Sequence, residues 1–386
     1  MGYFVSGFLL FEKILVNFDR EYNMNEAVTS LMCQLLAKKQ YVAFYTKCIM
    51  YKREKKMDEN FIKLIKSKRV LFVTTKNIDY IRNTQEIGII KENSKSLYEI
   101  FSNQKRYVGR IIEVWIKLMK YNIKDTDIIF IGFAPQLILP FFYLKMRKKV
   151  IIIDFFISVY DTLIHDRKNF KDLGIVARLC HLLDTITLNK ANNIITDTKV
   201  DEEYFIKEFK CNPGKFETLY LKADTSIFYP RKQCKRADLH NKFVVLYFGS
   251  MLPLQGVDVV LNAIELLKDQ ETIYFQIIGP ISDKYTKPIY GNVEYVDWLS
   301  QEKLAEYIAN ADLCLAGHFN GEIEKAKRTI PGKAYIYDAM EKPMILGENE
   351  ANKELFSQEK ENIYYIQMGN AKALADKISL LFDVWN

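Results

Sequence analysis

The strongest constraint on the fold is a pattern that occurs twice along the chain: short, unbroken apolar runs alternate with segments of helical periodicity. Such runs are typical of strands buried on both faces, and their alternation with helices indicates parallel sheets. The first set is RVLFVTT, DIIFIGF, VIIIDFF, NIITDT and FETLYL, and the second is FVVLYFGS, IYFQIIGP, VEYVDW, DLCLAG and PMILG. The sequence therefore predicts an α/β fold with two Rossmann-like domains.

The boundaries of these domains follow from where the pattern starts and stops. Residues 1–68 show no strand–helix alternation, although Met24 to Lys39 has an amphipathic helical pattern. We therefore expect a helical N-terminal extension over 1–68. The polar, basic segment YPRKQCKRADLHNK indicates a linker near residue 235. This divides the remainder into domains at 69–235 and 236–386, sizes that fit two domains in 386 residues.

The net charge of +7 is concentrated, because Lys47 to Arg69 alone contains nine basic and three acidic residues. A solvated linker face is the simplest interpretation, and attraction to an anionic membrane surface, to which the later basic cluster KMRKK would contribute, is the alternative. No helix-turn-helix, zinc-finger or RNP pattern accompanies the charge, so nucleic acid is not an expected partner.

The spacing of the cysteines and the lengths of the apolar segments indicate the cellular compartment. The six cysteines lie far apart without a Cys-x-x-Cys pair, so we expect reduced, buried thiols, no zinc site and a cytoplasmic protein. The apolar run Phe4 to Phe11 is short and lacks a preceding basic region, which argues against a signal peptide. The stretch Ile128 to Leu144 is interrupted by glycine and prolines, so a strand–turn–helix unit is expected there rather than a membrane span.

Two segments of the second domain carry a signal for anion binding. In FGSMLPLQGVD, Gly249 permits a sharp turn whose amides precede a helix, which suits a phosphate but equally suits an ordinary βα turn. In EKAKRTIPGKAY, Lys325, Arg328 and Lys333 surround a helix start at Pro331. Cations at a helix N-terminus are disfavoured by the helix dipole unless an anion binds between them. A solvated basic face is the alternative.

These segments, together with MEKPMILGENEANKELF, resemble the donor half of family-4-type glycosyltransferases of the GT-B fold, above all bacterial members linked to surface-polysaccharide assembly. Four segments of the first domain resemble the acceptor domain of the same family: QKRYVGRI, DIIFIGFAPQLILP, DFFISVYDTLIHDRK and TDTKVDEEYF. The resemblance covers residue 69 to the C-terminus in a common order. It implies two facing Rossmann-like domains, with a nucleotide-sugar donor on the second, an acceptor on the first, and neither metal nor cofactor.

Transferred residue by residue, the resemblance implies a donor site formed by Gly249, Ser250, Gln255, Gly256, Gly279, Lys325, Arg328 and Lys333. Ser250 and Gln255 stand where many relatives have Arg and Lys, so the diphosphate would need other cations. Ile336 stands where many relatives have the Glu that holds the donor ribose, and Arg328 falls on the first Glu of the usual pair. Asp338 lies two positions beyond Ile336, about 200° around the helix.

The acceptor half has a polar turn after VIIIDFF, from which we expect Asp161, His165 and Arg167 to be catalytic candidates. A lone loop histidine is more often incidental, so Asp161 and Arg167 fit the resemblance better. The D-x-D pattern of Asp125 and Asp127 precedes a strand, which favours a turn over a metal site. Asp201, Glu202 and Glu203 are interpreted as surface-helix residues.

The leading hypothesis is a retaining, metal-independent hexosyltransferase that moves a sugar from a nucleotide-diphosphate donor to a glycan or lipid-linked glycan in polysaccharide biosynthesis. It would be cytoplasmic and peripheral at the inner membrane. Two alternatives stay open: a non-catalytic, glycan-binding partner of a true enzyme, motivated by the missing Glu, and a GT-B nucleotide-sugar epimerase.

Overall fold

The computed structural model describes residues 60–166, 174–250, 252–356 and 362–386. The predicted extension lies largely outside these residues, as does the helix expected at Met24 to Lys39. Residues 60–65 are helical, and Phe61 and Ile65 pack into the core of the first sheet. Both sheets belong to one compact unit of the chain.

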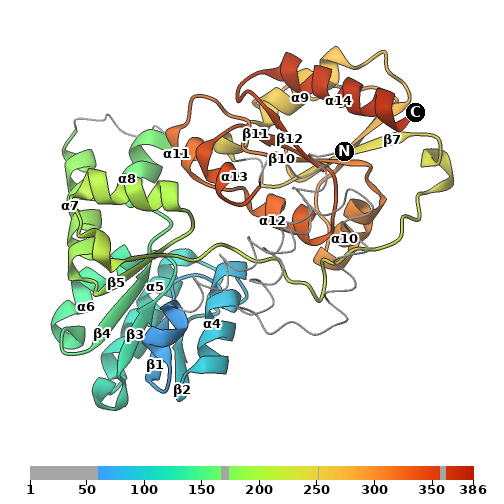
Figure 1. Cartoon of the computed structure of the whole chain (residues 1–386). Coiled ribbons are helices and arrows are strands. Elements are labelled where there is room, and N and C mark those ends of the chain that lie inside the picture. Colours follow the sequence, from blue (N-terminus) through green and yellow to red (C-terminus); the bar gives the residue numbers. More distant parts are fainter. Residues whose placement is uncertain (1–59, 167–173, 251, 357–361) are drawn as a thin grey trace, which may run out of the picture. The chain divides into compact units, whose positions relative to one another are not determined.

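Within the described residues, the strands form two six-stranded parallel sheets, as the repeated apolar runs predicted (Figure 1). The first sheet has the order β2-β1-β3-β4-β5-β6 and the second β12-β11-β10-β7-β8-β9. We call each sheet with its helices an α/β domain.

The first α/β domain contains β1 (Arg69–Val73), α4 (Ile81–Asn93), β2 (Ser96–Ile100), α5 (Tyr107–Lys120), β3 (Ile128–Ile131), α6 (Leu139–Met146), β4 (Val150–Asp154), α7 (Ile175–Lys190), β5 (Asn193–Thr196), α8 (Lys199–Phe209) and β6 (Phe216–Thr218). Its strands β1, β3 and β5 are almost wholly buried, which explains their unbroken apolar runs. Helices α5 to α8 share one core with the sheet, whereas α4 and residues 60–65 share another (Figure 1).

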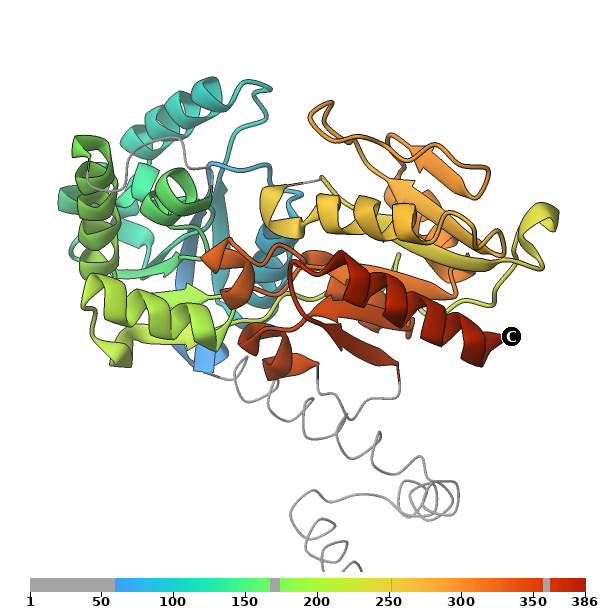
Figure 2. The same cartoon turned by 90° about the horizontal axis from the view of Figure 1, so that it is seen from above.

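The second α/β domain contains β7 (Phe243–Phe248), α9 (Val257–Leu266), β8 (Ile273–Ile278), β9 (Val293–Val296), α10 (Gln301–Asn310), β10 (Leu313–Gly317), α11 (Glu324–Arg328), α12 (Gly332–Ala339), β11 (Met344–Gly347), α13 (Glu350–Leu355), β12 (Ile363–Ile366) and α14 (Ala371–Trp385). Helices α9 and α14 lie side by side over this sheet (Figure 2). The apolar side of each helix supplies the core, for example Val260, Ile264 and Ile378.

Two sequence expectations about burial need correction. The thiols of Cys180, Cys211 and Cys314 are free and buried as expected, but Cys234 is exposed, because it lies in the connection that precedes the second sheet. Asp201 was expected on a helix surface but is only 1% exposed. No helix among the described residues combines the length and apolarity needed to cross a bilayer.

Candidate functional site

The strand order indicates where a ligand would bind. In open parallel sheets, ligands bind beyond the carboxyl ends of the strands, where the order reverses. That reversal falls between β1 and β3 in the first sheet and between β7 and β10 in the second. In the second domain, the point of reversal is flanked by the loops that begin at Gly249 and His318.

The loop after β7 needs glycine at two positions. Gly249 has φ +155°, and a Cβ there would lie 2.5 Å from Oε1 of Gln255. Gly256 has φ +65° and precedes α9, and a Cβ there would lie 2.6 Å from the backbone nitrogen of Asn320. Because both substitutions meet neighbouring atoms and an unfavourable φ, the loop is fixed in a tight conformation. This explains why FGSMLPLQGVD places its glycines where it does.

Lys333 lies directly behind this loop. Its Nζ donates to Oε1 of Gln255 at 3.1 Å and sits 3.9 Å from the ring centroid of Tyr247. A Cβ on Gly249 would be 3.3 Å from the same nitrogen. Lys333 is 5% exposed, and burial holds its pKa well below the usual range. Among the described residues, no carboxylate lies within ion-pair distance of it. A buried cation of this kind is costly unless an anion accompanies it.

A cavity of about 320 Å³ lies between the loops of the two α/β domains. The first domain contributes Tyr80, Arg82, Phe156, Thr162 and Asp197 to its lining. The second domain contributes Leu252, His318, Lys325, Gly332 and Tyr335. Gly332 is the first residue of α12, so the positive end of that helix borders the cavity beside the Lys325 cation. Of the expected donor residues, Lys325 is in the lining that the described residues form, whereas Gly249, Gln255 and Lys333 lie outside it.

His318 is a lining residue that is 6% exposed. Burial, reinforced by the charge of Lys333, lowers the pKa of its imidazole to about 3. Its Nδ1 lies 3.4 Å from Oγ1 of Thr329. The imidazole is therefore neutral at physiological pH and can take part in hydrogen bonds without adding charge.

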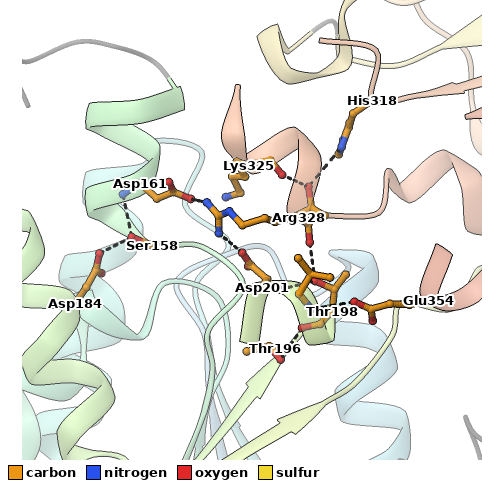
Figure 3. A network of polar contacts seen from close by, with 12 residues as sticks. Ser158, Asp161, Asp184, Thr196, Thr198, Asp201, His318, Lys325, Arg328 and Glu354 are labelled. Atoms are coloured by element: carbon orange, nitrogen blue, oxygen red, sulfur yellow. Dashed lines mark hydrogen bonds and ion pairs between the residues drawn. The ribbon is translucent and has the colours of Figure 1, made fainter. Parts of the chain in front are cut away.

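Arg328, unlike Lys333, points toward carboxylates of the first domain, and Figure 3 shows Asp161 and Asp201 at its guanidinium. Its guanidinium donates to Asp161 at 2.7 Å and to Asp201, and it lies 3.5 Å from the ring centroid of Tyr204. Burial alone would lower the pKa of Arg328, but the two carboxylates outweigh it and raise the pKa. Its carbonyl also accepts a hydrogen bond from Thr198 at 2.7 Å. Arg328 therefore joins the two α/β domains, and its role toward a donor stays a prediction.

The first domain supplies a charged group of residues that sequence reasoning missed. Arg82 is 3% exposed and pairs with Asp154 at 2.9 Å and with Glu86 at 3.4 Å. Asp197 follows β5 and lines the cavity, and its buried Oδ1 has no hydrogen-bond partner among the described residues. Burial raises the pKa of Asp197 to about 6. The only sequence signal was the position of TDT at the end of a predicted strand, where ligand-contacting residues gather.

The remaining residues of the predicted sites are Asp161, His165, Arg167, Ser250 and Gly279. Asp161 opens a wide helical turn at Asp161–Asp166 and is 2% exposed, held against Arg328. Arg167 and the side chain of His165 lie outside the described residues. Ser250 is exposed in the loop after β7, whereas Gly279 directly follows β8 and donates its amide hydrogen to the carbonyl of Val296 at 2.7 Å. Neither is part of the cavity lining that the described residues form.

The D-x-D pattern forms a structural turn, as predicted. A short helical turn at Ile123–Asp125 leads into β3, and Asp127 holds Arg69 through two side-chain contacts of 2.8 and 3.1 Å. Across the part of the chain that the structure describes, no cluster of three or more His, Cys, Asp or Glu side chains could hold a metal ion.

Comparison with known proteins agrees with this architecture. Residues 242–383 match the model of the family Glycosyl transferases group 1. No curated protein matches the chain. The second α/β domain is thus a group 1 glycosyltransferase domain, and the two-domain fold is that of GT-B glycosyltransferases, the class that the sequence resemblance implied.

Solved structures with this fold include sucrose-phosphate synthase from Thermosynechococcus elongatus, with a TM-score of 0.60 and 11% identity over 82% of this chain and 90% of that one. Anabaena Alr3699/HepE, solved with UDP and glucose, has a TM-score of 0.55 and 12% identity over 82% and 90%. A glycosyltransferase from Rickettsia africae has a TM-score of 0.54 and 14% identity over 83% and 89%. At these identities the likeness shows the fold.

Proposed function

We propose that the protein transfers a sugar from a nucleotide-diphosphate donor to a glycan or lipid-linked glycan acceptor. The observation that carries this proposal is the position of Lys333, a buried amine without a carboxylate partner among the described residues. It comes one residue after Gly332, the first residue of α12, which lines a cavity together with Lys325. This arrangement suits the charge of a diphosphate. The Anabaena protein of the same fold was solved with UDP and glucose, which supports a donor of this class.

Transfer breaks the bond between the anomeric carbon and the diphosphate oxygen, and the electron pair goes to the diphosphate. The acceptor hydroxyl oxygen forms the new bond to the anomeric carbon, and its proton goes to the leaving diphosphate. Fixed cations and amide dipoles stabilise the leaving diphosphate where its charge increases. Lys333, Lys325 and the N-terminal end of α12 would supply this stabilisation here. We accordingly propose a metal-independent reaction, and one that retains the anomeric configuration.

The acceptor would meet the donor on the side of the cavity that the first domain forms. Asp197 is the described carboxylate that lines this side with an unpartnered oxygen, so we propose that it accepts a hydrogen bond from a substrate hydroxyl. Asp161 is held by Arg328, which fits a role in positioning the two domains better than contact with substrate. A lipid-linked acceptor would place the enzyme in polysaccharide biosynthesis, at the cytoplasmic side of the inner membrane.

Calorimetry with a panel of nucleotide-diphosphate sugars, followed by measurement of donor hydrolysis and transfer, tests the proposal. We expect one donor to bind and to be hydrolysed slowly in the absence of acceptor. NMR of the transferred product would establish the anomeric outcome. Binding without any turnover would favour a non-catalytic partner, for which Ile336 at the position of the usual Glu is the motivation. Absence of binding to any nucleotide would overturn the proposal.

A further inference from the structure

Helix α5 has two apolar faces, and the core of the protein uses only one of them. Val114 and Leu118 are fully buried against the first sheet. On another side, Val108, Ile112, Ile116 and Met119 recur every three or four residues and are 68, 53, 42 and 59% exposed. This spacing aligns the four side chains in one stripe along the helix. A continuous exposed stripe of this kind marks an interaction surface.

The stripe continues onto α6. Trp115 packs its ring 4.8 Å from that of Phe141, and its Nε1 donates to the carbonyl of Leu137 at 2.9 Å. Lys145 of α6 donates to the carbonyl of Met119 at 2.7 Å. Phe141 and Leu144 are 61 and 78% exposed. We call this surface the α5–α6 apolar face and define it by Val108, Ile112, Ile116, Met119, Phe141 and Leu144.

Basic residues are concentrated in the segments that contain and adjoin this face. Residues 105–149 contain ten basic and three acidic residues, an excess of +7 that equals the net charge of the whole chain. All three acids are paired, Glu113 with Lys117 at 2.7 Å and the two aspartates with Arg69. Arg106, Lys120 and Lys148 are exposed, and the described residues offer them no carboxylate partner. An apolar stripe accompanied by basic side chains is the pattern of a helix that lies in a membrane surface.

We propose that the α5–α6 apolar face docks the protein on an anionic lipid surface. Apolar side chains would enter the boundary between headgroups and acyl chains, and the basic side chains would contact anionic headgroups. A second copy of the chain fits less well, because a symmetric contact would bring two sets of basic side chains together. Residues 1–59 of the same chain also fit less well, since their nine basic and seven acidic residues offer no negative charge to these basic side chains.

This inference rests on the proposed function in one respect: membrane contact would bring the cavity close to a lipid-linked acceptor. The contact lies on α5 and α6 and includes the basic cluster KMRKK at 145–149, whereas Lys47 to Arg69, the other basic segment expected to contact membranes, lies outside it. The described chain begins on the other side of the first sheet, where Phe61 packs with the α4 residues Ile87 and Ile90.

Flotation of the full chain with vesicles tests the proposal. The vesicles contain phosphatidylcholine alone or phosphatidylcholine mixed with phosphatidylglycerol. We expect the wild type to float mainly with the anionic vesicles, and less as salt is raised. The variant Val108→Gln/Ile112→Gln/Phe141→Gln should lose about tenfold or more of its affinity for these vesicles. The variant Lys120→Glu/Lys148→Glu should lose its preference for anionic lipid.

The matched control is Ile289→Gln/Trp298→Gln, which removes side chains of the second domain that are 88 and 77% exposed. It should float like the wild type. Equal flotation of the triple variant and the control would overturn the proposal. So would a triple variant that floats normally but changes its sedimentation, because the face would then bind a second copy. Nucleotide binding is measured in parallel: a wild type that floats but binds no nucleotide would uphold this inference and overturn the proposed function.

Discussion

The guanidinium of Arg328 lies 2.7 Å from the carboxylate of Asp161, which is 167 residues away in the sequence. Arg328 ends α11 of the second domain, and Asp161 begins the wide turn after β4 of the first. Asp201 of α8 holds the same guanidinium from another direction. A cation expected to face a substrate is thus part of the contact between two domains.

We predict that Arg328→Met destabilises the protein by about 3–5 kcal/mol, because it leaves two buried carboxylates without their cation. Urea denaturation gives this free energy of unfolding. Lys327→Met is the matched control, since Lys327 lies on the same helix, has a side chain that is 43% exposed and pairs with Glu324. It should change stability by less than about 0.5 kcal/mol. Equal stability of the two variants would show that the ion pairs contribute nothing.

Lys333→Met should weaken nucleotide-diphosphate binding about tenfold or more, since a charge-assisted contact is worth about 1.5–3 kcal/mol. It should not destabilise the free protein, because the buried charge has no carboxylate partner among the described residues. Calorimetry measures the affinity, with Lys327→Met again as the control. Lys325→Met should act in the same direction, as Lys325 lines the cavity. Unchanged affinity in both variants would contradict a diphosphate site here.

Asp197 should make stability depend on pH. Burial raises the pKa of the Asp197 carboxyl to about 6 in the folded protein. In the unfolded chain an aspartate has a pKa of about 3.9, so between these two pH values only the folded protein keeps the proton. Stability from this group is therefore greatest below about pH 4 and falls as pH rises toward 6. Asp197→Asn should remove that fall and stabilise the protein by about 1–3 kcal/mol at pH 7. Denaturation at pH 5 and pH 7 checks this, and identical pH profiles for variant and wild type would refute it.

Transfer should persist in the presence of a chelator. The described residues contain no cluster suited to a metal ion, and Asp127 of the D-x-D pattern is held by Arg69. The assay compares initial rates with and without EDTA, then with added magnesium or manganese. A rate that disappears with EDTA and returns with the metal would require a metal-dependent mechanism instead.

Asp338→Ala should change nucleotide affinity by less than about twofold. Asp338 is exposed on α12, while Lys333 and Tyr337 of the same helix are buried toward β7. At about 100° per residue, a side chain that points outward cannot reach the ribose of a donor beside Lys333. Calorimetry against the preferred nucleotide decides the matter, and a large loss would make Asp338 the substitute for the missing Glu.

Sequence patterns predicted the two sheets because their central strands are apolar without interruption, as in β3 and β7. The same reasoning missed β2, whose first four residues alternate between exposed and partly buried at the edge of the first sheet. An edge strand of SLYEI contains too little apolar sequence to stand out.

The candidate site was predictable where it depends on local sequence. Gly249, Gln255 and Lys333 do come together, because the loop after β7 and the start of α12 meet at the point where the strand order reverses. The partners of Arg328 were not predictable, since Asp201 looks like any polar residue in the first turn of a helix. Only the packing of one domain against the other turns it into a buried counter-ion.

Helix α8 begins with hydrogen bonds supplied by the other domain. Its amides at Lys199 and Val200 each donate to Glu354 of α13 at 2.9 Å. Because Glu354 accepts hydrogen bonds from these two amides, their hydrogens exchange slowly with solvent only while α13 stays in place. The amide protons of Lys199 and Val200 are thus internal reporters of domain separation, and their exchange rates would follow each opening of the cavity without any attached label.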